Sequence, residues 1–420
     1  MAGFISQCKG KFRRRLLSIL VLSFMVHLTF ALIASHGLVQ DDAPSYRDLG
    51  RNLAHGQGFV FSPGAQPTAW RAPAYPLFLG AIFKMTGDSE TVARAANALL
   101  WVGTTACVAV IAFQLMEPSA ALLACALVAF FPEFIGLSGL LYSESLSIFL
   151  FMASLAALVA LAVQRRWSLA ILAGVLLGCC ILSRSTFVVL PFLIVLAGFF
   201  GLLKRTQAIV VAVLALALMG CWTVRNYRLL HLFIPVESNS TLNLFMGSRP
   251  YAPMPFTIRV VKLIAADPEW RSIVTLSPAQ QYTAFGKAST RDIRRNPGRF
   301  ALLGISKAID FWTPDYFVAR NFTSGSFGEQ FKSIWKLVLF VTVTSFLVVW
   351  SAALVTIVRE RRSRVVQFAV LLLIAYTLPH CIVYGASKYH LPLTPIGCML
   401  AAPALLHFAR GLRRHEVESV

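Results

Sequence analysis

Two adjacent acids, Asp41 and Asp42, lie directly after the first long apolar run of the chain and shortly before Tyr46. Carboxylates at the edge of a membrane cost little free energy while water solvates them, so the pair is compatible with an ordinary hydrophilic loop. It also suits a general base, or a ligand for a divalent cation, held where the phosphate of a lipid would lie. Arg71 and Tyr75 follow in the same polar segment, and a guanidinium there either anchors lipid headgroups or binds phosphate oxygens in pairs. The residue types indicate acid–base and phosphate chemistry beside a bilayer.

Further candidates border apolar runs later in the chain. Glu144 precedes a long apolar segment, where the positive end of a helix dipole favours an acid; alternatively it faces the acid pair across an outer cavity. Arg184 separates two apolar runs and either extends to the membrane interface or lines a polar cavity. Arg225 begins a long polar segment, and we expect it to order the start of that segment.

The composition is that of a membrane protein. The chain has 420 residues, of which 57% are hydrophobic and 13% charged, and its mean hydropathy is +0.70. Soluble domains carry about 25% charged residues, so these values indicate a bilayer as solvent. The formal net charge of +20 lies mainly in Lys and Arg that flank apolar runs, which fits membrane orientation and lipid phosphates and excludes a nucleic-acid partner. The eight cysteines show no metal-ligand spacing, and we interpret them as apolar packing residues.

Ten segments are apolar enough to predict transmembrane helices, since a helix needs about 20 apolar residues to cross the hydrocarbon core. They are residues 16–39, 95–116, 119–137, 145–163, 168–182, 186–203, 207–224, 335–358, 365–384 and 391–409. The first is too long for a signal-peptide core, so we predict that it is retained. Lys and Arg concentrate in alternate loops, which the positive-inside rule assigns to the cytoplasm. We therefore predict a multi-pass protein of the inner or plasma membrane with both termini in the cytoplasm.

This topology divides the chain into three parts. Residues 1–224 form an N-terminal transmembrane module whose first outside segment, 40–94, carries the chemistry. Residues 225–334 form a mainly helical outside segment, and residues 335–420 form the last membrane helices and a cytoplasmic tail.

Both outside segments contain predicted helices. The stretches 46–54 and 75–85 are amphipathic and suit the membrane surface. Ser277-Pro278 predicts a helix start, and Asn296-Pro297 predicts a break before a further helix that ends near Trp312. Because most of the polar mass lies outside, we expect the chemistry there.

Short motifs occur along the chain in the order typical of a known family. In the first outside segment they are Asp42-Ala43, Tyr46, Asn52-Leu53-Ala54, Gly56, Gly58-Phe59, Arg71, Pro73, Tyr75-Pro76, Arg94 and Asn97. Later ones are Tyr142-Ser143-Glu144-Ser145, Trp222, Arg225-Asn226-Tyr227, Lys388-Tyr389, Leu391-Pro392 and Pro395. In these residues the chain resembles bacterial members of the dolichyl-phosphate-mannose–protein mannosyltransferase family. It is similar, more distantly, to the aminoarabinose transferases that modify lipid A.

The resemblance implies a glycosyltransferase C fold. This is an all-α polytopic membrane protein with about ten transmembrane helices and an active site on extracytoplasmic loops. The catalytic or metal-associated acid of the family corresponds to Asp42. The aminoarabinose transferases carry Lys where Arg71 stands, a difference that keeps the charge but changes the geometry of phosphate binding. The resemblance also implies that Lys388 and Tyr389 contact the phosphate or the lipid of the carrier.

We therefore predict an enzyme that transfers a hexosyl or pentosyl group from polyprenyl phosphate to an acceptor on the extracytoplasmic face, with inversion. The predicted bases are Asp42 and Glu144. The predicted ligands of the donor phosphate are Arg71, Lys388, Arg184 and Tyr389. The residues expected to support them are Asp41, Tyr46, Tyr75 and Arg225. A divalent cation at Asp42 is compatible with the pattern but not required, and the acceptor can be a protein, lipid A or another glycan.

A transporter or lipid flippase is the main alternative. It would place charged residues at the middle of its spans, whereas most charges here lie at the ends of apolar runs or in the outside segments. A non-catalytic membrane subunit of an envelope complex is a second alternative, and it gives no reason for Asp42, Arg71 and Lys388 to fall on one side of the membrane.

Overall fold

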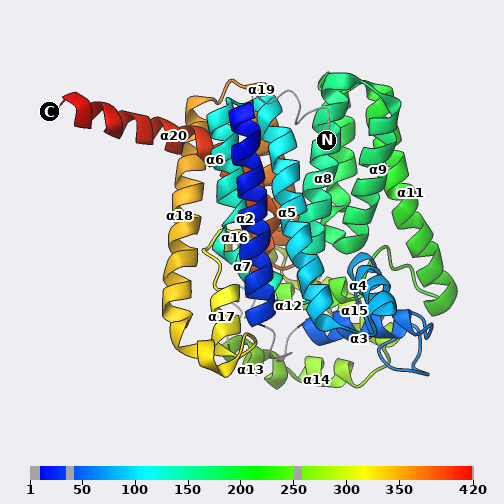
Figure 1. The fold of residues 1–420 in the computed structure, drawn as a ribbon. Helices are drawn as coiled ribbons and strands as arrows, with labels where there is room; N and C mark the ends of the chain where they lie inside the picture. Colours follow the sequence, from blue (N-terminus) through cyan, green and yellow to red (C-terminus); the bar gives the residue numbers. More distant parts are fainter. Residues whose placement is uncertain (1–9, 35–41, 250–257, 419–420) are drawn as a thin grey trace.

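The computed structural model describes residues 10–34, 42–249 and 258–418, which form helices and loops without a strand. Long helices run roughly parallel, while shorter helices gather at the lower end of the bundle in Figure 1. The long helices are α2 (Gly10–Ile33), α5 (Glu90–Leu115), α8 (Ser143–Gln164), α9 (Trp167–Ser183), α11 (Arg205–Leu230), α18 (Trp335–Arg359), α19 (Arg364–Ile382) and α20 (Thr394–Glu418). The start of α2 and the end of α20 both lie at the opposite, upper end of the bundle.

Seven helices in the described ranges are long and apolar enough to cross a membrane. The helices α6 (Pro118–Ala129) and α7 (Pro132–Ser138), bent by 46° relative to each other, form either a broken eighth span or a re-entrant loop. The apolar helices α9 and α10 (Leu190–Phe199) are shorter. Each of the ten predicted segments therefore has a helical counterpart, and the prediction of a multi-pass membrane protein is confirmed.

Large apolar side chains stay exposed along the outer helices. Val21 and Met25 of α2 are 60% and 55% exposed, and Leu337 and Phe340 of α18 are 61% and 68% exposed. Such a surface is unfavourable in water, but lipid tails cover it in a bilayer. The backbone polar groups of these helices are satisfied within each helix, as a lipid environment requires.

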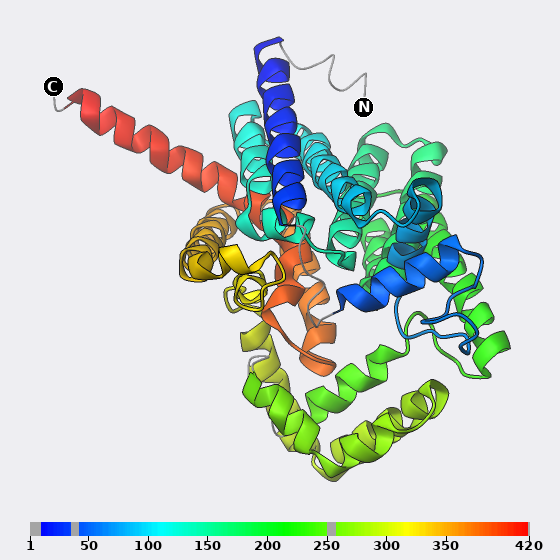
Figure 2. The same ribbon diagram turned by 60° about the horizontal axis from the view of Figure 1, so that its bottom comes forward.

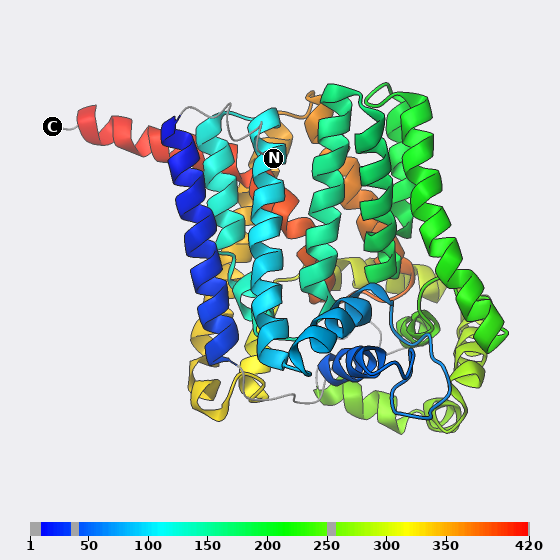
Figure 3. The ribbon, with the colours of Figure 1, turned by 45° about the vertical axis from the view of Figure 1, so that its right-hand side comes forward.

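The first outside segment folds into two short helices, α3 (Ala43–Ala54) and α4 (Ala74–Thr86), as its amphipathic pattern predicts. They pack closely because Gly50 and Gly80 lie at their crossing. A Cβ on Gly50 would lie 2.8 Å from the Cβ of Leu79, closer than real Cβ atoms come to one another. Figure 3 shows this pair in blue at the lower end of the bundle. The packing brings the start of α3 and the segment before α4 to the same place.

The second outside segment consists of further short helices. They are α12 (Asn239–Ser248), α13 (Ile258–Ala266), α14 (Pro268–Val274), α15 (Pro278–Arg295), α16 (Pro297–Phe311) and α17 (Phe317–Thr323). Ser277 caps α15 as predicted, since its backbone N–H donates to Gln280 Oε1 at 3.1 Å. The predicted break at Asn296 is also confirmed, because α15 ends there and Asn296 Oδ1 accepts a hydrogen bond from the backbone N–H of Arg299 in α16 at 3.0 Å. Figure 2 shows α12 to α15 as a green to yellow-green arch at the lower edge of the molecule.

The end of α11 differs from the prediction. The apolar run ends at residue 224, but α11 continues to Leu230. The polar residues beyond that run hold the next stretch of chain against the helix: Asn226 Nδ2 donates to the carbonyl of Ile234 at 2.9 Å. Trp222 Nε1 donates to the carbonyl of Val236 at 2.8 Å. A count of apolar residues does not detect such tertiary hydrogen bonds, so it placed the boundary too early.

Candidate active site

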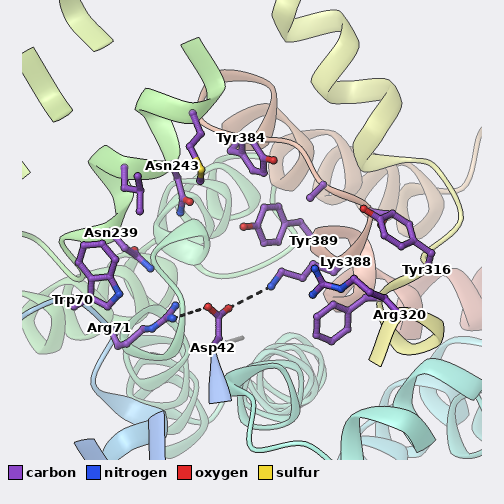
Figure 4. Close-up of a pocket in the computed structure, with 15 residues that line it drawn as sticks. Asp42, Trp70, Arg71, Asn239, Asn243, Tyr316, Arg320, Tyr384, Lys388 and Tyr389 are labelled. Atoms are coloured by element: carbon purple, nitrogen blue, oxygen red, sulfur yellow. Dashed lines mark hydrogen bonds and ion pairs between the residues drawn. The ribbon is translucent and has the colours of Figure 1, made fainter. Parts of the chain in front are cut away.

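A cavity of about 200 Å³ lies where the first outside segment, α12, α17 and the loop after α19 meet. Its charged and polar lining residues are Asp42, Arg71, Asn239, Asn243, Arg320, Ser387 and Lys388, and its aromatic ones are Trp70, Tyr316, Phe317, Tyr384 and Tyr389. Figure 4 shows Asp42 between Arg71 and Lys388. Residues from five separate parts of the sequence thus share one small space.

Asp42 is the centre of this cluster. Its Oδ1 accepts a hydrogen bond from Arg71 Nη2 at 2.6 Å, and its Oδ2 lies 3.4 Å from Lys388 Nζ. The side chains are 30% exposed at Asp42, 12% at Arg71 and 18% at Lys388, so the group is partly shielded yet open to the cavity. Three residues predicted from the sequence to act together are therefore in contact.

The electrostatics of the cluster favour the charged forms. Burial would raise the pKa of Asp42, but the charges of Arg71 and Lys388 outweigh burial and hold that pKa well below its usual range. Burial would likewise lower the pKa of Arg71, and Asp42 raises it instead. The two cations therefore favour the ionised carboxylate of Asp42.

Arg71 is fixed in place by α3. Its Nε donates to Ser45 Oγ at 2.9 Å, and its guanidinium carbon lies 4.9 Å from the centre of the Tyr46 ring. The hydroxyl of Tyr46 lies 3.0 Å from Ser143 Oγ, and the Tyr75 ring packs edge-on against the Tyr46 ring. Burial raises the pKa of Tyr46 to about 12, so its hydroxyl stays neutral. Tyr46 and Tyr75 thus occupy the supporting positions expected of them, behind the cation.

Lys388 lies at the start of a 3-10 helix, Ser387–Leu393, that leads into α20. Its Nζ is 5.0 Å from the centre of the Phe317 ring and 5.8 Å from that of Tyr389. Asp315 accepts hydrogen bonds from Ser387 Oγ and from the backbone N–H of Phe317, both at 2.9 Å. Asp315 therefore ties together the two segments that flank Lys388.

Burial of Asp315 raises its pKa to about 6, although the hydrogen bonds from Phe317 and Ser387 oppose this shift. A folded-state pKa above the unfolded one means that the folded protein holds this proton more tightly, so stability falls as pH rises. We expect the free energy of unfolding to fall by up to about 3 kcal/mol between pH 4 and pH 7 through this residue. Thermal unfolding in detergent should show a shallower pH slope for Asp315→Asn, and equal slopes would contradict the prediction.

Glu144 and Arg184 form a layer behind the cavity and do not line it. Glu144 Oε1 accepts a hydrogen bond from Arg184 Nη1 at 3.0 Å, and both side chains are almost fully buried, at 4% and 12% exposure. The guanidinium of Arg184 lies 5.0 Å from the centre of the ring of Tyr389, a residue that lines the cavity. In this arrangement Glu144 neutralises Arg184, and Tyr389 contacts both the pair and the cavity.

This pair allows a test by substitution. Arg184→Met leaves the Glu144 carboxylate buried without its partner, and we expect a loss of about 3–5 kcal/mol of stability. The double variant Arg184→Met/Glu144→Gln should recover most of that loss, as measured by thermal unfolding. A stable double variant that keeps the activity of the wild type makes the pair structural, whereas a stable but inactive one assigns it a part in the reaction.

Arg225, another predicted residue, lies elsewhere. Arg225 does not line the cavity: its Nη1 donates to the carbonyl of Thr68 at 2.7 Å, and its guanidinium stacks 4.6 Å from the Trp222 ring centre. Arg225 therefore holds the chain just before Arg71 against α11. Asp41 lies outside the described residues.

Several lining residues were not predicted from the sequence. Arg320 of α17 points into the cavity beside Lys388, and Tyr316 lies next to it (Figure 4). Asn239 and Asn243 of α12 face the cavity from the opposite side. The one available signal was an amphipathic spacing within α12, since its cavity residues recur every three or four positions.

A divalent cation does not fit the described residues at this point. Both oxygens of Asp42 face cationic side chains, and Glu144 is neutralised by Arg184. In the described ranges no group of three or more His, Cys, Asp or Glu side chains is arranged to hold a metal ion. Arg71 and Lys388 occupy the place that a metal would take beside Asp42.

Residues 70–224 match the family model described as dolichyl-phosphate-mannose-protein mannosyltransferase. This match starts at Trp70, directly before Arg71, and ends within α11. No curated protein sequence matches the chain significantly.

Solved structures of membrane enzymes share the architecture. The archaeal oligosaccharyltransferase AglB from Archaeoglobus fulgidus, in complex with an inhibitory peptide and a dolichol-phosphate, is 16% identical and has a TM-score of 0.51, with 95% of this chain and 52% of that chain covered. The same enzyme tethered with an acceptor peptide gives a TM-score of 0.55 at 15% identity, covering 95% and 50%. ArnT from Cupriavidus metallidurans bound to undecaprenyl phosphate has a TM-score of 0.45 at 13% identity, covering 92% and 76%. The chain thus spans about half the length of the oligosaccharyltransferase. By its helical architecture the chain has the glycosyltransferase C fold, as the sequence predicted.

Proposed function

We propose that this protein transfers a sugar from a polyprenyl phosphate to an acceptor at the outer face of the membrane. The observation that carries the proposal is the contact of Asp42 with Arg71 and Lys388 inside one cavity. A carboxylate beside two cations supplies a base and a site for a phosphate leaving group in the same place. The matched family model and the fold support the same reaction class.

The two ends of the cavity suit the two parts of such a donor. Arg71, Lys388 and Arg320 can bind the phosphate. Asn239 and Asn243 offer amide groups to sugar hydroxyls, and Asn239 Oδ1 is buried without a hydrogen-bond partner among the described residues. The cavity volume of about 200 Å³ is below the roughly 300–1,000 Å³ of sites for drug-sized ligands, which favours a single sugar over a long oligosaccharide.

The proposed reaction is one displacement at the anomeric carbon. The acceptor hydroxyl gives its proton to Asp42 while its oxygen forms a bond to that carbon. The bond from the carbon to the phosphate oxygen breaks, and the polyprenyl phosphate leaves with the electron pair. Arg71 and Lys388 stabilise the negative charge that grows on the phosphate. Because the two oxygens lie on opposite sides of the carbon, the sugar is inverted, and no step requires a metal ion.

Donor binding also prepares the base in this scheme. Without donor, the two cations are neutralised by Asp42, which makes its carboxylate a weak base. A donor phosphate competes for the same cations, so their hold on Asp42 weakens and its proton affinity rises. Asp42 thereby becomes an effective base only when the leaving group is in place.

The protein is placed by this proposal in the inner or plasma membrane, with the cavity outside and both termini in the cytoplasm. Alternation of basic loops along the sequence supports this orientation. The start of α2 and the end of α20 lie at the bundle end opposite the cavity, which is consistent with this orientation (Figure 1).

The direct test supplies purified protein with a polyprenyl phosphate that carries a radiolabelled sugar, together with an envelope extract as a source of acceptors. The enzyme releases polyprenyl phosphate and moves the label to an acceptor. A flippase moves the intact donor across a vesicle membrane without cleaving it, and that outcome would replace the proposal.

A further inference from the structure

A second surface, which carries cationic and hydroxyl side chains, lies on the far side of α12 from the cavity. It is an open groove of about 760 Å³ along α15. Its lining residues are Thr241, Tyr282, Thr283, Gly286, Lys287, Thr290, Arg291, Arg294 and Arg295. We call this surface the α15 groove.

The cations of the α15 groove form one stripe. Lys287, Arg291, Arg294 and Arg295 are spaced by four, three and one residues, which puts them on the same face of a helix. All four are exposed. The negative end of the helix dipole accounts for cations in the last turn only, and Lys287 lies two turns earlier. The helix dipole therefore does not account for the whole stripe of cations.

Acids near α15 do not neutralise this stripe. Asp267, Glu269 and Asp292 all pair with Arg249, and Glu269 additionally pairs with Arg291 at 2.6 Å. Lys287, Arg294 and Arg295 make no ion pair with the residues that the structure describes. Three positive charges thus remain in the α15 groove.

The rest of the lining indicates the kind of ligand. Hydroxyl groups of threonines and a tyrosine alternate with the cations, and large aliphatic side chains are missing from the groove lining. Thr290 Oγ1 donates to the carbonyl of Gly286 at 2.8 Å, so its oxygen remains free to accept a hydrogen bond. Hydroxyl groups and cations together suit a sugar chain with acidic groups. A lipid would also need large apolar side chains to cover its tails.

The groove and the cavity are joined by α12. Residues 239, 242, 243 and 246 of this helix line the cavity, while Thr241, on its opposite face, lines the α15 groove. Figure 2 shows α12 and α15 lying side by side. The two sites are therefore separated by about the 10–12 Å diameter of one helix. A ligand held in the groove can extend a hydroxyl over α12 to Asp42.

We propose that the α15 groove binds the acceptor, and that this acceptor is an acidic glycan carrying phosphate or carboxylate groups. That the bound glycan is the acceptor rests on the proposed function, but binding of the glycan can be measured without sugar transfer. Arg291 is already paired, so Lys287, Arg294 and Arg295 carry most of the attraction.

The test uses an oligogalacturonate, a carboxylate-bearing sugar chain too long for the cavity, and the full-length protein in nanodiscs of phosphatidylcholine. The triple variant Lys287→Gln/Arg294→Gln/Arg295→Gln should weaken binding at least 10-fold, since Gln keeps the helix and removes the charge. The matched control Arg228→Gln/Lys262→Gln/Arg271→Gln removes as much charge from exposed positions outside the groove and should change binding less than 3-fold.

Equal weakening by both triple variants would show attraction to net charge alone and would overturn the proposal. Binding of short-chain phosphatidylglycerol that the groove substitutions abolish, together with no binding of oligogalacturonate by the wild type, would reassign the groove to lipid headgroups. Groove binding without any sugar transfer by the wild type would instead contradict the proposed function, so the two failures are distinguishable.

Discussion

Asp42→Asn is expected to reduce sugar transfer by about 10²–10⁴-fold, the usual contribution of a positioned general base. The amide keeps the shape of the side chain and can still accept a hydrogen bond from Arg71, but it cannot take the acceptor proton. Initial rates with a radiolabelled lipid-linked sugar measure the effect. The loss should appear in kcat, because the donor phosphate retains both of its cations.

Asp48→Asn is the matched control for this experiment. Asp48 lies on the same helix, α3, pairs with Arg47 at 2.8 Å and does not line the cavity. Both variants should reach the membrane in normal amounts and elute as the wild type does in size-exclusion chromatography. Full activity of a well-folded Asp42→Asn protein would remove Asp42 from the reaction.

Arg71→Ala is expected to reduce transfer by about 10²–10³-fold, because it removes a charged hydrogen-bond donor from the leaving phosphate. Use of the lipid donor should suffer more than use of the acceptor, so KM for the donor rises while KM for the acceptor stays near its original value. Arg71→Lys should be intermediate, since an ammonium keeps the charge but cannot bind two oxygens in a fixed geometry.

Arg47→Ala on α3 controls for loss of a cation near the membrane surface and should retain activity. Its side chain pairs with Asp48 and does not line the cavity. Equal loss of donor and acceptor use in Arg71→Ala would indicate that Arg71 organises α3 and does not bind the phosphate.

The membrane fold was predictable because hydropathy reports burial in lipid directly. Every apolar segment expected from the sequence has a helix among the described residues, and the Ser–Pro and Asn–Pro signals located both ends of α15. The bend between α6 and α7 was not predicted, because the apolar run continues beyond Pro132 and Glu133 and predicts one segment, 119–137. Likewise, the end of α11 depends on hydrogen bonds from Asn226 and Trp222 to chain that follows later.

The site was predictable in part for a related reason. Asp42 and Lys388 stand next to apolar runs, and Arg71 lies in the polar segment that begins beside Asp42, so the predicted membrane topology puts all three at one face. Arg320 and Asn239 lie within a long polar segment, where nothing local distinguishes a cavity residue from a solvated one. Glu144 and Arg184 lie at the ends of different helices, so their pairing could not be predicted from single segments of the sequence.

In the proposed mechanism, Asp42 of the free protein pairs with the same two cations, Arg71 and Lys388, that later bind the donor phosphate. The affinity of purified protein for polyprenyl monophosphate, measured by native mass spectrometry for the wild type, Asp42→Asn and Arg71→Ala/Lys388→Ala, tests it directly. We predict binding to Asp42→Asn that is equal to or tighter than to the wild type, and binding at least 10-fold weaker to the double variant. Weaker binding to Asp42→Asn, or unchanged binding to the double variant, would contradict the account.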